Sequence, residues 1–390
     1  MRITWVTRSF LDYRIPVYEE INRLCGNQLT VIYFSDVVPQ RCQDKLKSIL
    51  GKQAKGLTGE LRLGGKKIEN QAYANTGWLR IPLRPGLTRI LKKTNPDIIL
   101  SDGFFQWTYA ALFANFLWQI PHIMCYERTL HTERNVSIIR TIGRKIAMKF
   151  INAICCNGIQ TKKYLLNLGY PTDQLFLGNM SADSKEMQKS VAAFKPKVLS
   201  ALKTKYNIAG PIFLYAGQLI PRKGIIELLS AWKEFSEKNP EPKLLLIGGG
   251  EQQKQTIEFV HNENIKGVKI LGNVDYSDMA GFYAMADIFI IATLEDNWSL
   301  VVPEAMSCGL PIICSQYNGC WPELVKPENG WVFDPLDYVN FINTLNEAWD
   351  KRSNWEEMGQ QSLRIVQDFT PEKVAQNIYS ACLKVTGTTD

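Results

Sequence analysis

The stretch ADIFIIATLEDNWSLVVPEAMSCGLPII, residues 286–313, decides the fold class of this chain. It begins with a short apolar run, which predicts a buried strand, and continues through an acidic loop into a helix that starts near Ser299. A second apolar run follows Gly309-Leu310-Pro311 and predicts another buried strand. Strand, helix and strand in this order form the repeating unit of a parallel α/β sheet.

The same alternation of strand and helix signals extends over the rest of the chain. In the first half it predicts strands in 2–8, 28–34, 95–103, 120–126 and 151–158, and helices in 12–25, 137–149 and 161–170. Residues 41–93 are expected to be largely irregular. In the second half we expect strands in 211–217, 243–250, 268–273, 286–293 and 310–316. From Trp355 onward, two helices should be separated at Thr370-Pro371.

The length of 390 residues predicts two domains. Residues 184–208 are rich in Lys and Ser, lack strong strand character and are the expected crossing between the domains. The alternating pattern restarts after this segment. We therefore expect two doubly wound α/β domains.

The composition is that of a folded globular protein, with 45% hydrophobic and 21% charged residues. The nine Cys residues include no Cys-x-x-Cys pair, so neither a disulfide framework nor a zinc site is indicated, and a reducing cytosol fits best. No metal-ligand pattern includes the three histidines, His122, His131 and His261. The N-terminal MRITWVTRSFLDYR carries charges where a secretory signal needs apolar residues, so we expect no export.

The net charge of +7 divides unevenly along the chain. Residues 1–185 hold 26 Lys and Arg against 13 Asp and Glu, whereas residues 186–390 hold 19 against 25. Most of the excess lies in 41–93, where 13 basic residues accompany three acids. This stretch is either a solvated surface or a contact for an anionic membrane surface or a phosphate-bearing acceptor. Nucleic acid is disfavoured, since no recognition-helix or RNA-binding signature is present.

Residues 103–126 contain no charged residue over 24 positions. Pro121 limits the helix in this segment to roughly 14 residues, too short to span a membrane. We expect a buried, aromatic-rich helix followed by a strand. Shallow insertion of residues 104–118 into a membrane is the alternative.

In open α/β sheets, ligands bind at the carboxyl ends of the strands, so the loops there are the candidate site. After the strand in 211–217, Arg222 and Lys223 lie in the turn that enters a helix, which suits a diphosphate. The glycines in 248–250 allow close backbone approach but do not form the dinucleotide fingerprint. After the strand in 286–293, Ser299 is a candidate N-cap, and Asp296 and Glu304 are placed to bind sugar hydroxyls. Because small and apolar residues follow Glu304, a carboxylate without a protein partner there would be costly unless a ligand used it.

Taken together, these motifs resemble the retaining glycosyltransferases of family 4. DNWSLVVPEAMSCGLPII resembles the family's acid, seven residues, Glu signature, and GQLIPRKG resembles its phosphate-binding loop. LLIGGG, ILGNV and ENGWVFDP match later segments, and YRIPVYEEI, NPDIILSDG, IPHIMCY and YLLNLGYPTDQL match more loosely in the first half.

The resemblance implies the GT-B fold, in which two Rossmann-like, doubly wound parallel-sheet domains face a central cleft. Residues 1–185 would bind the acceptor and 186–365 the nucleotide-sugar donor, while a C-terminal helix in 366–390 would pack back on the first domain. Donor-binding residues would include Gly217, Gln218, Gly248 and Gly249.

The resemblance also assigns roles to individual side chains. Glu304 would bind the ribose, Asp296 a hydroxyl of the donor sugar, and Lys223 the leaving diphosphate. The backbone of Asn297, Trp298, Ser299 and Leu300 would cover the sugar and the distal phosphate.

Three positions depart from the family pattern or match it loosely. The family places an Arg directly after the Gly of the phosphate loop, where this chain has Gln218, so Arg222 is the candidate substitute. Glu295 stands beside Asp296 as the alternative first acid. In the first domain, Glu127 and His131 are candidate acceptor-side residues.

By resemblance, the function is metal-independent transfer of a sugar from a nucleoside-diphosphate sugar, with UDP as the expected nucleotide. The acceptor would be a glycan or lipid-linked glycan of bacterial surface polysaccharide synthesis. The enzyme would be cytoplasmic, with peripheral attachment to the membrane. The alternatives are a GT-B nucleotide-sugar epimerase and a non-catalytic protein that binds sugar nucleotides or glycans.

Overall fold

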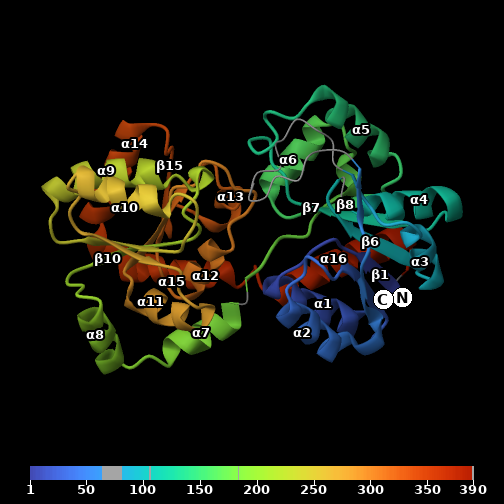
Figure 1. Ribbon diagram of the computed structural model, residues 1–390, viewed down its shortest axis with the longest axis horizontal. Coiled ribbons are helices and arrows are strands. Elements are labelled where there is room, and N and C mark those ends of the chain that lie inside the picture. Colours follow the sequence, from blue (N-terminus) through green and yellow to red (C-terminus); the bar gives the residue numbers. More distant parts are fainter. Residues whose placement is uncertain (64–80, 105–106, 183, 389–390) are drawn as a thin grey trace. The chain divides into compact units, whose positions relative to one another are not determined.

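The computed structural model describes residues 1–63, 81–104, 107–182 and 184–388, and the chain divides into two compact units (Figure 1). The first unit combines Met1–Met180 with Pro371–Asp390, and the second is Ser181–Thr370. The chain crosses between them after Met180 and again at Thr370, just before Pro371 begins the last helix.

In the described part of the first unit, seven parallel strands form a sheet in the order β3-β2-β1-β6-β7-β8-β9. This order proceeds outward from β1 in both directions, which is the doubly wound arrangement that the sequence predicts. The strands are β1 (Ile3–Val6), β2 (Leu29–Phe34), β3 (Ala54–Leu57), β6 (Ile98–Asp102), β7 (His122–Tyr126), β8 (Ala153–Cys156) and β9 (Leu175–Leu177). A separate antiparallel pair is formed by β4 (Leu61–Leu63) and β5 (Ile81–Leu83).

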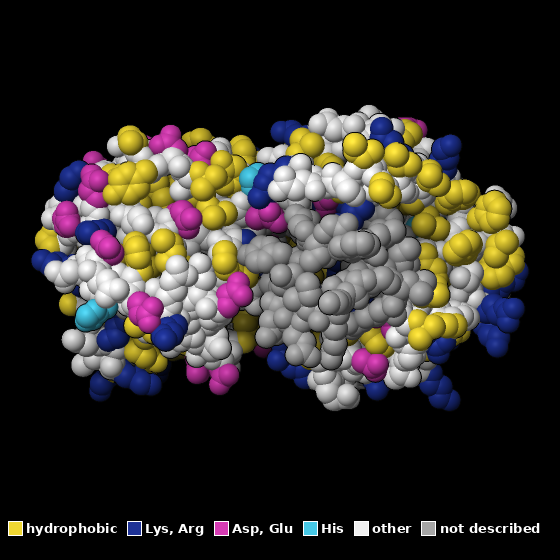
Figure 2. Space-filling model, turned by 45° about the horizontal axis from the view of Figure 1, so that its top comes forward, with side chains coloured by type: hydrophobic (Ala, Val, Ile, Leu, Met, Phe, Trp, Pro, Cys, Tyr) yellow, Lys and Arg dark blue, Asp and Glu magenta, His cyan; other side chains and the backbone are white. Residues whose placement is uncertain are grey.

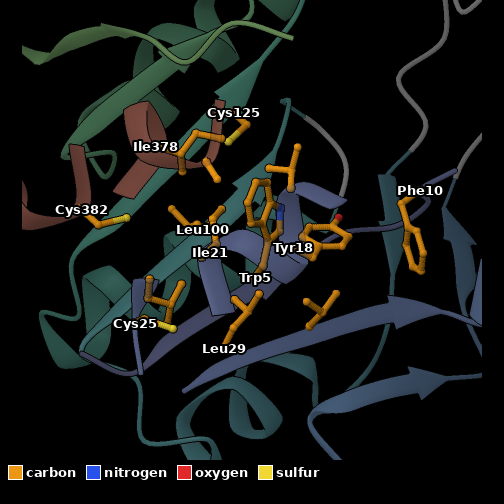
Figure 3. Close-up of a cluster of buried hydrophobic side chains, with 14 of the residues drawn as sticks. Trp5, Phe10, Tyr18, Ile21, Cys25, Leu29, Leu100, Cys125, Ile378 and Cys382 are labelled. Carbon is orange, nitrogen blue, oxygen red and sulfur yellow. The ribbon is translucent and has the colours of Figure 1, made fainter. Parts of the chain in front are cut away.

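The helices of this unit are α1 (Ile15–Leu24), α2 (Gln40–Leu50), α3 (Leu87–Lys93), α4 (Thr108–Trp118), α5 (Ile138–Met148), α6 (Ile159–Asn167) and α16 (Pro371–Thr386). Most of them bury apolar faces in its core, and α5 is the exception, since it buries Arg144 and Met148 and exposes its isoleucines. Trp5 and Tyr18 share one core with Ile378 and Cys382 of α16, so the end of the chain completes the first core (Figure 3).

Two expectations for this unit are wrong. Residues 41–93 are not largely irregular, because most of their described part forms α2, β3 and α3, although residues 64–80 lie outside the described residues. Nor is the aromatic-rich helix fully buried. Helix α4 buries Ala110, Ala111 and Ala114 and exposes Phe113 and Phe116, because its alanines allow close packing on the sheet.

In the described part of the second unit, six parallel strands form a sheet in the order β12-β11-β10-β13-β14-β15, again doubly wound. The strands are β10 (Ile212–Ala216), β11 (Lys243–Ile247), β12 (Val268–Gly272), β13 (Ile288–Ile291), β14 (Ile312–Ser315) and β15 (Gly330–Phe333). Phe213 of β10 contacts the rings of Trp232, Phe235 and Trp355 in an aromatic core.

The second unit's helices are α7 (Ser184–Ala192), α8 (Pro196–Lys205), α9 (Ile225–Lys238), α10 (Gln253–Asn262), α11 (Met279–Met285), α12 (Val301–Ser307), α13 (Trp321–Leu324), α14 (Tyr338–Asp350) and α15 (Trp355–Val366). The expected crossing segment, 184–208, instead forms α7 and α8, which pack on α11. The break at Thr370-Pro371 separates α15 from α16 and is confirmed. Within the described ranges, we find no helix with the length and apolar character needed to cross a bilayer.

Candidate functional site

The loops that follow β10 and β13 are hydrogen-bonded to each other. The carbonyl oxygen of Arg222, in a 3-10 turn (Pro221–Lys223), accepts from the Leu294 amide at 2.8 Å and from the Thr293 hydroxyl at 2.9 Å. Gly224 closes this turn at φ 65°, and a side chain there would overlap the carbonyl of Ala292. Glycine therefore lets two strand-end loops come together.

This junction brings Lys223 and Asp296 into a buried ion pair, with each side chain only 12% exposed. Asp296 also accepts from the Ser299 hydroxyl at 2.6 Å and from the Trp298 amide at 3.2 Å. Burial alone would raise the pKa of Asp296, but the charge of Lys223, helped by hydrogen bonds and by Arg222, lowers it below its ordinary value. Asp296 is therefore held as a carboxylate.

Ser299 does not cap a helix, contrary to the sequence expectation. Helix α12 begins at Val301, its N-cap is Leu300, and no side chain caps it. The Ser299 hydroxyl is taken by Asp296 instead, because the ion pair offers a stronger, charged acceptor.

A third loop, after β14, supports this arrangement and was missed by sequence reasoning. The buried Asn318 accepts from the Ser299 amide at 3.2 Å, and the Gly319 amide donates to the Asp296 carbonyl at 3.1 Å. The only signal in the sequence is the Asn-Gly turn at 318–319, directly after the predicted strand.

Glu304 projects from α12 and has a protein partner on the preceding helix, α11. The Tyr283 hydroxyl of α11 donates to Glu304 at 3.1 Å. Burial raises the pKa of Glu304 to about 7, while hydrogen bonds from Tyr283 and Tyr276 oppose the rise. Within the described residues, Glu304 forms no ion pair with Lys or Arg. Its pKa therefore allows both protonation states near neutrality.

The predicted donor-site glycines bring the loops after β10 and β11 into close contact. A side chain at Gly248 would overlap the carbonyl of Gly217, and the Gly249 carbonyl accepts from the Leu219 amide at 2.9 Å. Gln218 between them has an exposed side chain. Because these glycines lack side chains, a ligand can contact the backbone of the two loops directly.

The remaining candidates of this unit line the loop before α12. Trp298 is buried with its ring 6.2 Å from that of Phe369, whereas Glu295, Asn297 and Leu300 are partly exposed. The Glu295 carbonyl lies 3.5 Å from an Arg222 guanidinium nitrogen. Arg222 is thus directed toward the loop that holds Asp296.

In the first unit, Glu127 follows β7 and lies beside a buried arginine. Arg14 is 3.5 Å from Glu127 and 3.6 Å from Asp102, at the end of β6. Burial would lower the pKa of Arg14, but the two carboxylates, Asp102 above all, raise it well above its usual value. A pocket at this sheet edge is lined by Arg14, Tyr126, Glu127, Asn157, Asn179 and Ile378, among others. Arg14 and Asp102 were not predicted, because they meet only in the fold.

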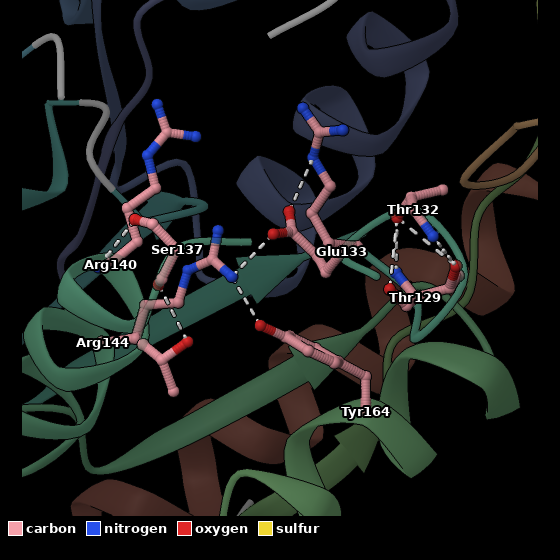
Figure 4. A network of polar contacts seen from close by, with 9 residues as sticks. Thr129, Thr132, Glu133, Ser137, Arg140, Arg144 and Tyr164 are labelled. Atoms are coloured by element: carbon pink, nitrogen blue, oxygen red, sulfur yellow. Dashed lines mark hydrogen bonds and ion pairs between the residues drawn. The ribbon is translucent and has the colours of Figure 1, made fainter. Parts of the chain in front are cut away.

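His131 lies in the turn between β7 and α5 and does not line this pocket, so Glu127 and His131 are not brought together there. The turn is built by Thr129 and Thr132, each of which accepts from the other's amide through its hydroxyl (Figure 4). Beside it, the buried Glu133 accepts from Arg144 of α5 at 2.8 Å.

No group of three or more His, Cys, Asp or Glu side chains is arranged for a metal ion among the residues that the structure describes. His122 is fully buried in the core, where it contacts Ser101, and burial lowers its pKa to about 4.

Comparison with protein families finds one match in the second unit. The model of the family Glycosyl transferases group 1 matches residues 202–363, which contain Lys223, Asp296 and Glu304.

Two curated relatives match mainly over part of their length. A GDP-mannose-dependent monoacylated alpha-(1-6)-phosphatidylinositol monomannoside mannosyltransferase of Corynebacterium glutamicum is 29% identical over 40% of this chain and 42% of its own length. The O-antigen chain mannosyltransferase B of Escherichia coli is 30% identical over 43% of each chain. The chain thus matches less than half of the length of these relatives.

Among solved structures, HepE of Anabaena in complex with UDP superposes with a TM-score of 0.74 at 16% identity, covering 98% of this chain and 100% of HepE. This likeness establishes that both units follow the fold expected from the sequence.

Proposed function

The chain belongs to the group 1 glycosyl transferases, a family with the GT-B fold, and on this premise we propose that it is a retaining glycosyltransferase. It transfers a sugar from a nucleoside-diphosphate sugar to an acceptor hydroxyl. The bond from the anomeric carbon to the diphosphate oxygen breaks, a bond to the acceptor oxygen forms, and the hydroxyl proton passes to the departing diphosphate. The observation that carries the proposal is the Lys223–Asp296 pair, held where two strand-end loops join.

Lys223 and Arg222 stabilise the diphosphate as its charge increases. A lysine ammonium has three N–H donors, and one of them is used by Asp296, so two remain for phosphate oxygens. Fixed cations in a site that is already mostly buried stabilise developing charge without reorganisation of solvent. Arg222 takes the role that the family gives to an Arg at the position of Gln218. No metal ion is required by this arrangement of charges.

The rest of the donor is held by carboxylates and backbone. Asp296, kept ionised by Lys223, accepts from a hydroxyl of the sugar, with Glu295 as the alternative acid, and Glu304 accepts from the ribose hydroxyls. The backbone of 297–300 covers the sugar and the distal phosphate. Gly217 and Gly248 admit the nucleotide close to the main chain.

The acceptor binds in the first unit. Its pocket contains Glu127, whose side chain is 39% exposed and anchored by Arg14, so the carboxylate can accept from a sugar hydroxyl. His131 is a second acceptor-side candidate on the following turn. We assign as acceptor a glycan or lipid-linked glycan of bacterial surface polysaccharide synthesis, made in the cytoplasm, in keeping with the names of the two mannosyltransferase relatives.

Incubation of the full chain with radiolabelled UDP- and GDP-sugars, followed by measurement of nucleotide release, tests the proposal. UDP is the first choice from the family resemblance, and GDP is the second because one relative is named for GDP-mannose. Release that requires an added acceptor supports transfer. Interconversion of the sugar nucleotide without acceptor indicates the epimerase, and binding without turnover indicates the non-catalytic protein.

A further inference from the structure

Helix α5 turns its apolar side chains outward. Ile138 and Ile139 are 77% and 76% exposed, and Ile142 and Ile146 are each more than half exposed. The residues that α5 buries are instead Arg144 and Met148. Positions 138, 142 and 146 lie one above another on a helix, so the isoleucines form a continuous stripe on the solvent side. A helix that only packed on its own unit would show the opposite arrangement.

Buried polar contacts of Arg144 explain how α5 stays attached to the unit while its isoleucines remain exposed to solvent. Arg144 donates to the buried Glu133 and to the Tyr164 hydroxyl of α6, and these groups lie beneath the helix (Figure 4). Both members of the Arg144–Glu133 pair are about 6% exposed. The helix is therefore fixed by a buried ion pair, and its apolar stripe does not serve the core.

Helix α4 contributes three more exposed apolar side chains, Phe113, Phe116 and Leu117. The ring of Phe116 contacts that of Phe150, just after α5, at 5.6 Å between centroids. We call the four isoleucines of α5 and these three residues the α4–α5 patch. Figure 2 shows hydrophobic side chains gathered over this part of the first unit. Exposed apolar patches of this extent usually mark an interaction site.

Basic residues predominate along the chain around α5, where the buried Glu133 already neutralises Arg144. Residues 134–172 contain seven Lys and Arg and no Asp or Glu. Lys145 and Lys149 are exposed and follow Ile142 and Ile146 by three positions, so they border the isoleucine stripe. Protein interfaces are depleted of lysine, whereas a helix with an apolar face bordered by lysines is typical of binding to anionic lipid.

We propose that the α4–α5 patch docks on an anionic lipid bilayer. The isoleucines enter the boundary between head groups and acyl chains, and Lys145 and Lys149 contact lipid phosphates. This assigns membrane contact to a different surface from residues 41–93. Helix α5 directly follows the turn that begins at Glu127, so docking would bring the first unit's pocket toward the surface where a lipid-linked acceptor resides. The docking itself does not depend on the proposed transfer activity.

Sedimentation of the full chain with vesicles tests this without any substrate. We expect binding to phosphatidylcholine mixed with phosphatidylglycerol and much weaker binding to phosphatidylcholine alone. Ile142→Gln with Ile146→Gln should lower the partition coefficient at least about tenfold, since each isoleucine loses apolar burial. The matched control is Ile257→Gln with Val339→Gln, at similarly exposed positions of the second unit, and should bind as the unmodified chain does.

A second pair of variants locates the charge contribution. Lys145→Gln with Lys149→Gln should weaken binding several-fold, and Lys45→Gln with Lys47→Gln on α2 should leave it unchanged. The reverse result would assign docking to residues 41–93 and overturn the proposal. So would absence of binding to anionic vesicles, or a dimer in light scattering that Ile142→Gln with Ile146→Gln converts to a monomer, because the patch would then join two copies of the chain.

Discussion

The two sheets carry different charged groups at their carboxyl edges. In the second unit, Lys223 and Asp296 form a one-to-one pair, and both side chains are nearly buried. In the first unit, Arg14 lies between Asp102 and Glu127 at 3.5–3.6 Å, and Glu127 is 39% exposed. The second unit's pair is enclosed and has Arg222 as a further cation beside it, whereas the Glu127 carboxylate of the first unit is partly exposed to solvent.

The two sites therefore suit different ligands, although the two sheets are similar. An enclosed lysine with free N–H donors suits a ligand of high charge, such as a diphosphate. An exposed carboxylate anchored by a buried arginine suits neutral hydroxyl groups, which vary among acceptors. The proposed roles of the two units follow from this contrast, and variants of each group test it.

The largest effect is expected for Lys223→Ala. It leaves Asp296 buried without its cation, so the free energy of unfolding should fall by about 3 kcal/mol, and transfer should slow at least about tenfold. Urea unfolding and turnover measure the two effects. Lys254→Ala, at an 89% exposed lysine, is the control and should change neither. Adding Asp296→Asn to Lys223→Ala should restore stability but not the rate of transfer. Unchanged turnover in Lys223→Ala would show that Lys223 does not stabilise the diphosphate.

Glu304→Gln should weaken nucleotide binding by on the order of 1.5–3 kcal/mol, the contribution of a hydrogen bond to a charged group. Isothermal calorimetry with the free nucleoside diphosphate measures it. Glu356→Gln, in the first turn of α15, provides the control at an exposed glutamate. Equal affinities in folded Glu304→Gln and the unmodified chain would show that the ribose lies elsewhere.

The raised pKa of Glu304 also predicts how stability depends on pH. In the unfolded chain this carboxyl ionises near its ordinary value of 4.5, whereas in the folded protein it keeps its proton up to about 7. The folded state therefore binds more protons in that window, and stability falls as pH rises through it. Between about pH 5 and about pH 8, the free energy of unfolding of the unmodified chain should fall by about 2 kcal/mol more than that of Glu304→Gln. This figure includes a reduction for solvent screening, because Glu304 is partly exposed. Parallel pH curves in urea unfolding would contradict this.

A smaller effect is expected in the first unit. Glu127→Gln should raise the KM for the acceptor about fivefold, as expected for one hydrogen bond of about 1 kcal/mol, and leave nucleotide affinity unchanged. Kinetics with varied acceptor and calorimetry with nucleotide separate the two. His131→Gln tests the second candidate by the same readouts. A change in nucleotide affinity alone would reverse the roles assigned to the two sheets.

No loss is expected on chelation, because lysine and arginine provide the positive charge at the diphosphate. Turnover with EDTA should equal turnover without it. If EDTA abolished turnover and magnesium or manganese restored it, the diphosphate would be stabilised by a metal ion and not by these side chains alone. Gln218→Arg should be tolerated or modestly beneficial, since it adds a cation to the same loop.

Sequence reasoning succeeded where structure follows local pattern. The strand and helix order, the break at Thr370-Pro371, and the positions of Lys223 in a turn before α9 and Asp296 in the loop after β13 all follow from apolar periodicity and turn residues. Sequence patterns did not predict the hydrogen-bond partner of a side chain where the fold offers more than one. The sequence predicts that Ser299 caps α12, but its hydroxyl donates to Asp296, and no pattern in the sequence pairs Glu304 with Tyr283.

The two doubly wound sheets and the strand-end loops with polar groups can be predicted from local sequence, because backbone hydrogen bonding and apolar burial impose periods that are visible over a few residues. Which charges meet depends on the tertiary fold. Lys223 and Asp296 are 73 positions apart, and Arg14 and Glu127 are 113 apart. Such pairs form because parallel strands deliver distant segments to one sheet edge. The outward isoleucines of α5 also depend on tertiary contacts, since the buried pair of Arg144 and Glu133 fixes which side of that helix faces the interior of the unit and which faces solvent.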